Sequence, residues 1–87
     1  MARIEIYTRP WCGYCARAKA LLLRKGQEFT DFDLESEPAR EAEMIARAGG
    51  ATSVPQVFID GRYVGGSDDL HALDRHGKLD PLLRARP

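Results

Sequence analysis

The first 34 residues carry a strand, helix, strand pattern that restricts the fold more than any other feature of the chain. Residues 3–8 alternate polar and apolar side chains, which is typical of a strand. Residues 13–25 place apolar side chains at helical spacing and stop at Gly26, and residues 29–34 alternate again. Because the joints are short, this segment predicts a βαβ unit with parallel strands and a right-handed crossover.

The remainder of the chain predicts one further helix, a hairpin and a closing helix. Asp-Gly between two β-like runs is the strongest short hairpin signal. In chain order we expect a helix from Ser36-Glu37-Pro38 to about Ala48, a strand over 54–59, a turn at Asp60-Gly61, a strand over 62–64, a helix capped by Ser67, and one or two helical turns over 79–83. The order β-α-β-α-β-β-α predicts an α/β fold, a single mixed sheet covered by helices.

The size and charge of the chain exclude several classes of protein. Eighty-seven residues make a single domain, 1–87, that buries about 64% of its unfolded surface without a metal or disulfide staple. Thirteen basic residues balance thirteen acidic ones, which argues against nucleic acid or a membrane surface as partner. We find no signal peptide and no run of eighteen apolar residues, so we expect a cytoplasmic protein.

Two cysteines, Cys12 and Cys15, form a C-x-x-C pair at the start of the first predicted helix. A bridge across so short a loop would stabilise the fold by only about 2 kcal/mol, so the pair is a poor structural staple. In a reducing cytosol such a pair is more often reactive. The helix N-terminus favours the thiolate of Cys12, as do the basic residues Arg9, Arg17 and Lys19.

The two sulfurs are expected to differ, because Cys15 lies one turn further along the helix and points back toward its start. We assign Cys12 as the attacking nucleophile and Cys15 as the more buried resolving thiol. One alternative is a pair of small buried hydrophobic residues. A zinc site is the other, but structural zinc needs four ligands, and His71 and His76 point to different helix faces.

Three ordered motifs extend the argument beyond the cysteines. They are Tyr7-Thr8-Arg9-Pro10-Trp11-Cys12-Gly13-Tyr14-Cys15, Thr52-Ser53-Val54-Pro55-Gln56 and Gly65-Gly66-Ser67-Asp68-Asp69-Leu70. With these motifs the chain resembles a glutaredoxin of the small bacterial dithiol type, from about Ile4 to Leu83. The resemblance implies a thioredoxin-like fold, a four-stranded mixed sheet flanked by helices, with glutathione as co-substrate.

The resemblance also implies how glutathione is held. The Val54-Pro55 bond would be cis, and the Val54 backbone would pair with the cysteinyl part of glutathione. The start of the third helix would hold the γ-glutamyl end, and Arg9 the glycine carboxylate, with Arg40 as a possible helper. The implied glutathione-binding residues are Arg9, Tyr14, Ser53, Val54, Pro55, Gly66, Ser67 and Asp68. Taken singly, the helix-start residues, the Gly65-Gly66 turn and Arg9 could equally be ordinary surface features.

The activity implied is glutathione-dependent thiol-disulfide exchange at a redox-active centre, serving electron transport and cell redox homeostasis. Cys12 would attack glutathionylated proteins, and Cys15 would resolve protein disulfides through a Cys12–Cys15 disulfide bond. The partners would be glutathione and glutathionylated or disulfide-containing proteins, and the enzyme a monomer that needs no metal.

One departure from the family pattern favours a rival function. Many dithiol members carry proline between the cysteines, where this chain has Gly13. Motifs without that proline are associated with glutathione-ligated [2Fe–2S] clusters, which would bridge two subunits through Cys12. Ser53 stands where threonine is commoner, and Ser67 replaces a cysteine of some relatives. A third possibility, an electron donor served by thioredoxin reductase, leaves the Gly65-to-Asp68 motif and Arg9 without a role.

Overall fold

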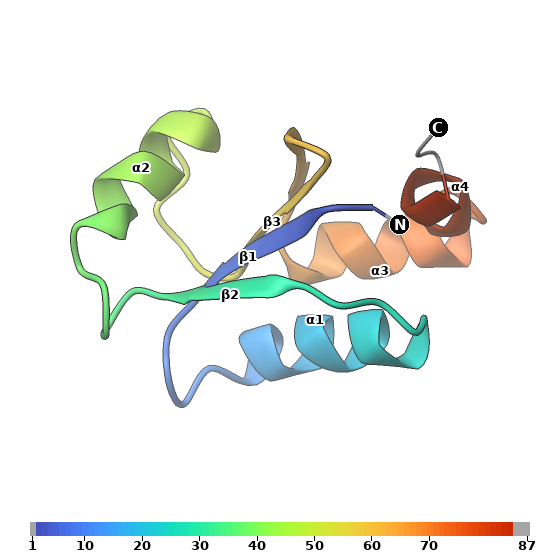
Figure 1. The fold of residues 1–87 in the computed structure, drawn as a ribbon, viewed down its shortest axis with the longest axis horizontal. Helices are drawn as coiled ribbons and strands as arrows, with labels where there is room; N and C mark the ends of the chain where they lie inside the picture. Colours follow the sequence, from blue (N-terminus) through green and yellow to red (C-terminus); the bar gives the residue numbers. More distant parts are fainter. Residues whose placement is uncertain (1, 85–87) are drawn as a thin grey trace.

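The computed structural model describes residues 2–84, and its strands form one four-stranded sheet in the order β2-β1-β3-β4 (Figure 1). β1 (Ile4–Thr8) pairs in parallel with β2 (Thr30–Asp33) and antiparallel with β3 (Gln56–Ile59). β4 (Arg62–Gly65) pairs antiparallel with β3 at the edge. The mixed sheet and the parallel β1–β2 pair are therefore confirmed.

The helices cover both faces of this sheet. α1 (Gly13–Arg24) and α3 (Ser67–Arg75) contact each other on one side of the strands, and α2 (Arg40–Arg47) lies on the other (Figure 1). α4 (Leu79–Arg84) follows α3 and contacts it. None of the helices within residues 2–84 has the length and apolar character needed to cross a membrane.

The alternation of β1 divides the core into two clusters. Ile4 and Ile6 pack with the buried side chains of α1 and α3, whereas Tyr7 packs with Leu34 and Met44 on the α2 side. Successive strand residues point to opposite faces, so one short strand supplies both clusters. The sheet thus fixes α1 and α3 on one face and α2 on the other.

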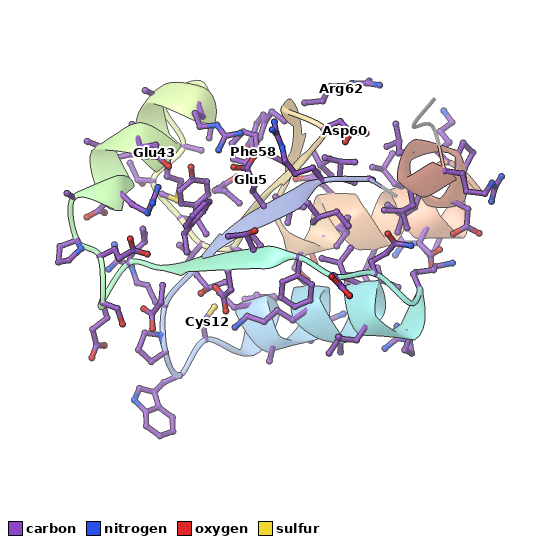
Figure 2. All side chains as sticks on the ribbon, viewed as in Figure 1. Glu5, Cys12, Glu43, Phe58, Asp60 and Arg62 are labelled. Carbon is purple, nitrogen blue, oxygen red and sulfur yellow. The ribbon has the colours of Figure 1, made fainter. Side chains whose placement is uncertain are left out.

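α2 is attached to the sheet by a polar network as well as by apolar contacts. The Tyr7 hydroxyl donates to the Glu43 carboxylate and accepts a 2.8 Å hydrogen bond from Arg47. Arg47 also pairs with Glu5 at 2.9 Å and lies 4.0 Å from the centre of the Phe58 ring. Glu5, Glu43 and Phe58 are labelled on this side of the sheet in Figure 2. A half-buried guanidinium paired in this way holds α2 against β1 and β3.

Several predicted boundaries were wrong by a few residues. α2 begins at Arg40 rather than at Ser36-Glu37-Pro38, because residues before it form turns. β3 begins at Gln56 rather than at residue 54, where the chain makes a cis bond to Pro55 instead of a ladder. The hairpin at Asp60-Gly61 is confirmed, and both residues have the positive φ that a tight turn of this kind requires.

Candidate active site

Cys12 is the N-cap of α1 and its sulfur caps the helix. The residue has an extended backbone, and the backbone N–H of Cys15 donates a 3.2 Å hydrogen bond to Cys12 Sγ. Cys12 is half-buried and lies where the loop from β1 enters α1 (Figure 2). The predicted position of this cysteine at the helix start is confirmed, and the N–H of Cys15 in the first turn of the helix faces its sulfur.

Cys15 has a different environment, as predicted. It lies in the first turn of α1 and is only 2% exposed, and both thiols are free. Burial, followed by a hydrogen bond with Cys12, raises the pKa of the Cys15 thiol to about 12. The backbone N–H of Arg9 and the charge of Lys19 act in the opposite direction but do not offset the burial. Cys15 is therefore a protonated thiol at neutral pH.

The basic residues expected around Cys12 are mostly engaged with other groups. Arg9 Nη2 pairs with Glu41 Oε2 of α2 at 2.8 Å, and Lys19 Nζ pairs with Asp31 of β2 at 2.5 Å. Arg17 lies 6.0 Å from the centre of the Tyr14 ring. The prediction of a basic environment around Cys12 was thus incomplete, because the carboxylates that the fold brings beside Arg9 and Lys19 are distant from them in the sequence.

A groove of about 430 Å³ opens beside Tyr14 in the first turn of α1, and Cys12, two residues earlier, is not among its lining residues. It runs between Tyr14, the loop before β3 and the N-terminal end of α3. Its lining residues are Tyr14, Ala51, Ser53, Val54, Pro55, Gln56, Tyr63, Gly66, Ser67, Asp68 and Asp69. The fold therefore brings together all the predicted glutathione-binding residues except Arg9. Arg9 is not among the lining residues and is held by Glu41.

The Val54-Pro55 bond is cis, as the family resemblance implied. The Pro55 carbonyl comes close to the Gly66 backbone, where an added Cβ would lie 3.3 Å from the oxygen. Gly65 has φ 121°, and a Cβ there would lie 2.3 Å from Asp69 Oδ2. Glycine at both positions lets the end of β4 pass closely between the Pro55 loop and α3.

The start of α3 corrects one prediction. Gly66, rather than Ser67, is the N-cap, and Ser67 is the first helical residue. The Asp69 carboxylate accepts a 3.0 Å hydrogen bond from the Gly66 N–H. The capping group is therefore supplied three residues after the cap, which is a recognised arrangement at helix starts. An acidic residue three positions after a helix cap is visible in the sequence, and it could have identified Asp69 as the capping residue.

Two groove residues were missed because their roles depend on strand pairing. The Tyr63 hydroxyl donates a 2.6 Å hydrogen bond to Gln56 Oε1. Gln56 Nε2 in turn donates to the Ser53 carbonyl at 2.9 Å. This chain of hydrogen bonds links β4, through the buried Gln56 of β3, to the loop that carries Val54. No local sequence pattern predicts it, since it requires the β3–β4 register.

Arg40, suggested as a helper, lies elsewhere. Its guanidinium is 4.1 Å from the centre of the Phe32 ring and pairs with Glu37 at 2.9 Å and Glu43 at 3.1 Å. Arg40 is not among the residues that line the groove. The structure thus gives Arg40 a place in the packing of α2 against β2.

Comparisons with known proteins agree on one family. The family model named Glutaredoxin matches residues 4–64. "Glutaredoxin 3" of Escherichia coli (strain K12) is 54% identical over 84 residues, covering 97% of this chain and 100% of that protein. Among solved structures, the buckwheat glutaredoxin–glutathione complex has a TM-score of 0.88 at 32% identity, covering 97% of this chain and 78% of that one. The solution structure of glutaredoxin from Brucella melitensis has a TM-score of 0.81 at 56% identity, covering 97% and 90%.

Proposed function

The chain belongs to the glutaredoxin family and is a thiol-disulfide oxidoreductase, and from that premise we propose that it reduces mixed disulfides between glutathione and proteins. Protein disulfides are its second class of substrate. The observation that carries the proposal is the half-buried Cys12 sulfur at the start of α1, which accepts the Cys15 N–H. The groove that begins at Tyr14, two residues after Cys12, is lined by polar groups of β3, β4 and α3.

The reaction begins at Cys12. Its thiolate attacks the glutathione sulfur of the mixed disulfide, so a Cys12–glutathione bond forms and the bond to the protein sulfur breaks. The protein leaves as a thiolate and takes up a proton. A second glutathione thiolate then attacks the glutathione sulfur on Cys12, which releases glutathione disulfide and restores the Cys12 thiolate. Two electrons pass from glutathione to the protein substrate.

Cys15 enters only when the substrate is a protein disulfide. Cys12 then forms a mixed disulfide with the protein. The Cys15 sulfur attacks Cys12 Sγ, the bond between Cys12 and the protein sulfur breaks, and a Cys12–Cys15 bridge forms while the departing protein thiolate takes up the proton that Cys15 loses. Burial raises the pKa of Cys15 to about 12, so it stays protonated until this step. The Arg9 N–H and the Lys19 charge favour the thiolate that forms as its proton leaves. Glutathione then reduces the bridge.

The groove accounts for glutathione as co-substrate. The buckwheat relative was solved as a glutathione complex, which supports the same ligand here. The Val54 backbone would pair with the cysteinyl part, and the N–H groups at the start of α3 would receive the γ-glutamyl carboxylate. Asp68 is exposed there and can accept from the ammonium. Arg9 is paired with Glu41, so this ion pair has to break before Arg9 can bind the glycine carboxylate.

The proposed setting follows from the co-substrate. Reduced glutathione is the thiol pool of the cytoplasm, so we place the enzyme there as a monomer that passes electrons from glutathione to proteins. Its contribution would be to cell redox homeostasis.

The deciding experiment is turnover of a glutathione mixed disulfide with glutathione, glutathione reductase and NADPH. Cys12→Ser should be inactive, because no sulfur remains to accept glutathione. Cys15→Ser should keep activity on the glutathione mixed disulfide and lose it on a protein disulfide. An active Cys12→Ser enzyme would overturn the assignment of the nucleophile.

Gly13 supports a second candidate, a [2Fe–2S] carrier. A Cβ at Gly13 would meet nothing within 4 Å, so the space beside Cys12 is open. Because Cys15 is buried, each subunit can offer one sulfur, and a four-sulfur cluster would need Cys12 from two subunits and two glutathiones. Such a cluster would hold the enzyme in a form without a free nucleophile. Protein purified without oxygen should then be brown and dimeric, and a colourless monomer would refute this candidate.

A further inference from the structure

Trp11 stands apart from the groove although it precedes the nucleophile. Its side chain is 100% exposed, and it is not among the residues that line the groove. Within residues 2–84 the indole makes no hydrogen bond, ring contact or cation–π contact. Trp11 is therefore a large apolar side chain beside Cys12 with nothing in the described chain covering it.

The backbone of Trp11 is also unusual. Its φ is 59°, in the left-handed region that a bulky residue rarely adopts. Asp60 is the other non-glycine residue with positive φ in the described chain, and its Asp-Gly turn explains it. Glycine or asparagine would adopt the Trp11 conformation with less strain. Strained residues of this kind gather at sites that hold ligands.

The direction of the chemistry indicates what covers the indole. The glutathione half of the mixed disulfide is proposed to fill the groove lined by Tyr14, Val54 and Ser67. The other half, the protein, then has to leave Cys12 on a side that the groove does not occupy. Trp11 is the neighbour of Cys12, one Cα–Cα step of about 3.8 Å away, and lies outside the groove.

We propose that Trp11 is a docking residue for the polypeptide half of the mixed disulfide, and that it contacts an apolar side chain next to the glutathionylated cysteine. Tryptophan is well suited to this task, because it buries a large area with few rotatable bonds and its indole N–H can donate to a backbone carbonyl. The enzyme would then select glutathionylated cysteines with apolar neighbours. This inference rests on the proposed function and adds a preference for the protein half of the substrate.

The test compares three glutathione mixed disulfides: one with free cysteine, one with a short peptide that has leucine on both sides of its cysteine, and one with serine at those positions. The full-length enzyme should turn over the leucine peptide with a kcat/KM about tenfold above that of the serine peptide, as expected for an aromatic hot spot. In Trp11→Gly this ratio should fall to about one. Trp11→Asn, which also suits a positive φ, should give the same result.

The control variant is Leu23→Ala, which removes another exposed apolar side chain, on the last turns of α1. It should keep the tenfold ratio. The inference would be overturned if Trp11→Gly keeps the parent's ratio, or if the parent enzyme turns over the leucine and serine peptides with the same kcat/KM. A concentration-dependent dimer that Trp11→Gly abolishes would overturn it in favour of a second copy as the occupant. Failure of the parent enzyme on the cysteine–glutathione disulfide would instead refute the proposed function.

Discussion

Selective alkylation provides a direct measure of how strongly the fold protects Cys15. In Cys12→Ser, Cys15 is the one remaining sulfur that iodoacetamide can modify as a cysteine. The substituted serine keeps a small polar group at the N-cap, so α1 should keep its capped start. The largest cause of the raised Cys15 pKa, its burial, is unchanged by this substitution.

The size of the effect follows from the pKa. Burial and the hydrogen bond with Cys12 raise the pKa of Cys15 from an ordinary value of 9.0 to about 12. At pH 7.5 the thiolate fraction then falls from roughly 3% to roughly 0.003%, because each pH unit below the pKa lowers it about tenfold. Only the thiolate reacts, so the full shift would slow alkylation about a thousandfold relative to an unperturbed thiol. Cys12→Ser keeps the burial of Cys15 but loses the hydrogen bond and the charge of Cys12, so we expect a slowing between about tenfold and about a thousandfold in this variant.

Mass spectrometry of timed samples supplies the rate. The rate should rise about tenfold for each pH unit from 7 to 10 without reaching a plateau. The same variant in denaturant should react at the rate of a free cysteine, which shows that the fold causes the protection. Circular dichroism would verify that the variant is folded. A folded Cys15 that reacts within tenfold of free cysteine would refute the reasoning.

Three further outcomes are expected. Gly65→Ala should lower the free energy of unfolding by at least about 2 kcal/mol and Tm by roughly 8–16 °C, because the added Cβ would meet Asp69 at a φ of 121°. Gly13→Ala should leave the stability unchanged or raise it, and calorimetry compares the two variants. Unfolded Cys15 loses its proton near pH 9.0 and folded Cys15 near 12, so the free energy of unfolding should fall as pH rises through that window, by up to about 1.4 kcal/mol per pH unit. Urea titrations from pH 8 to 10.5 should show that the free energy of unfolding falls less steeply with pH in Cys15→Ala than in the parent protein. Tyr7→Phe should lower the free energy of unfolding by about 2 kcal/mol, because the buried Tyr7 hydroxyl that it removes lies between a carboxylate and a guanidinium of α2. A thermal melt measures this loss.

Much of the fold could be predicted because the relevant forces act over a few neighbouring residues. The alternation of residues 3–8 placed Ile4 and Ile6 on one face, and both are buried with α1 and α3. Asp60-Gly61 identified the hairpin by its turn chemistry alone. The start of α2 was harder, because a proline and acidic residues open a turn as well as they open a helix.

The site was predictable to the extent that it depends on helix starts and turns. The C-x-x-C spacing placed Cys12 at the N-cap and Cys15 one turn later, which made the difference in burial foreseeable. The hydrogen bonds from Tyr63 to Gln56 and on to Ser53 could not be foreseen. They connect two strands and a loop, and only the β3–β4 register brings these side chains into contact.

The sequence by itself therefore determined the βαβ start, the hairpin and the pair of cysteines at a helix N-terminus, because these follow from periodicity and from groups within one turn of each other. Only the tertiary structure decided the electrostatics around Cys12. The partners of Arg9 and Lys19, Glu41 and Asp31, are distant in sequence and are brought there by α2 and β2. Ion pairs depend on distances of a few ångströms, which the packing of the sheet and its helices sets.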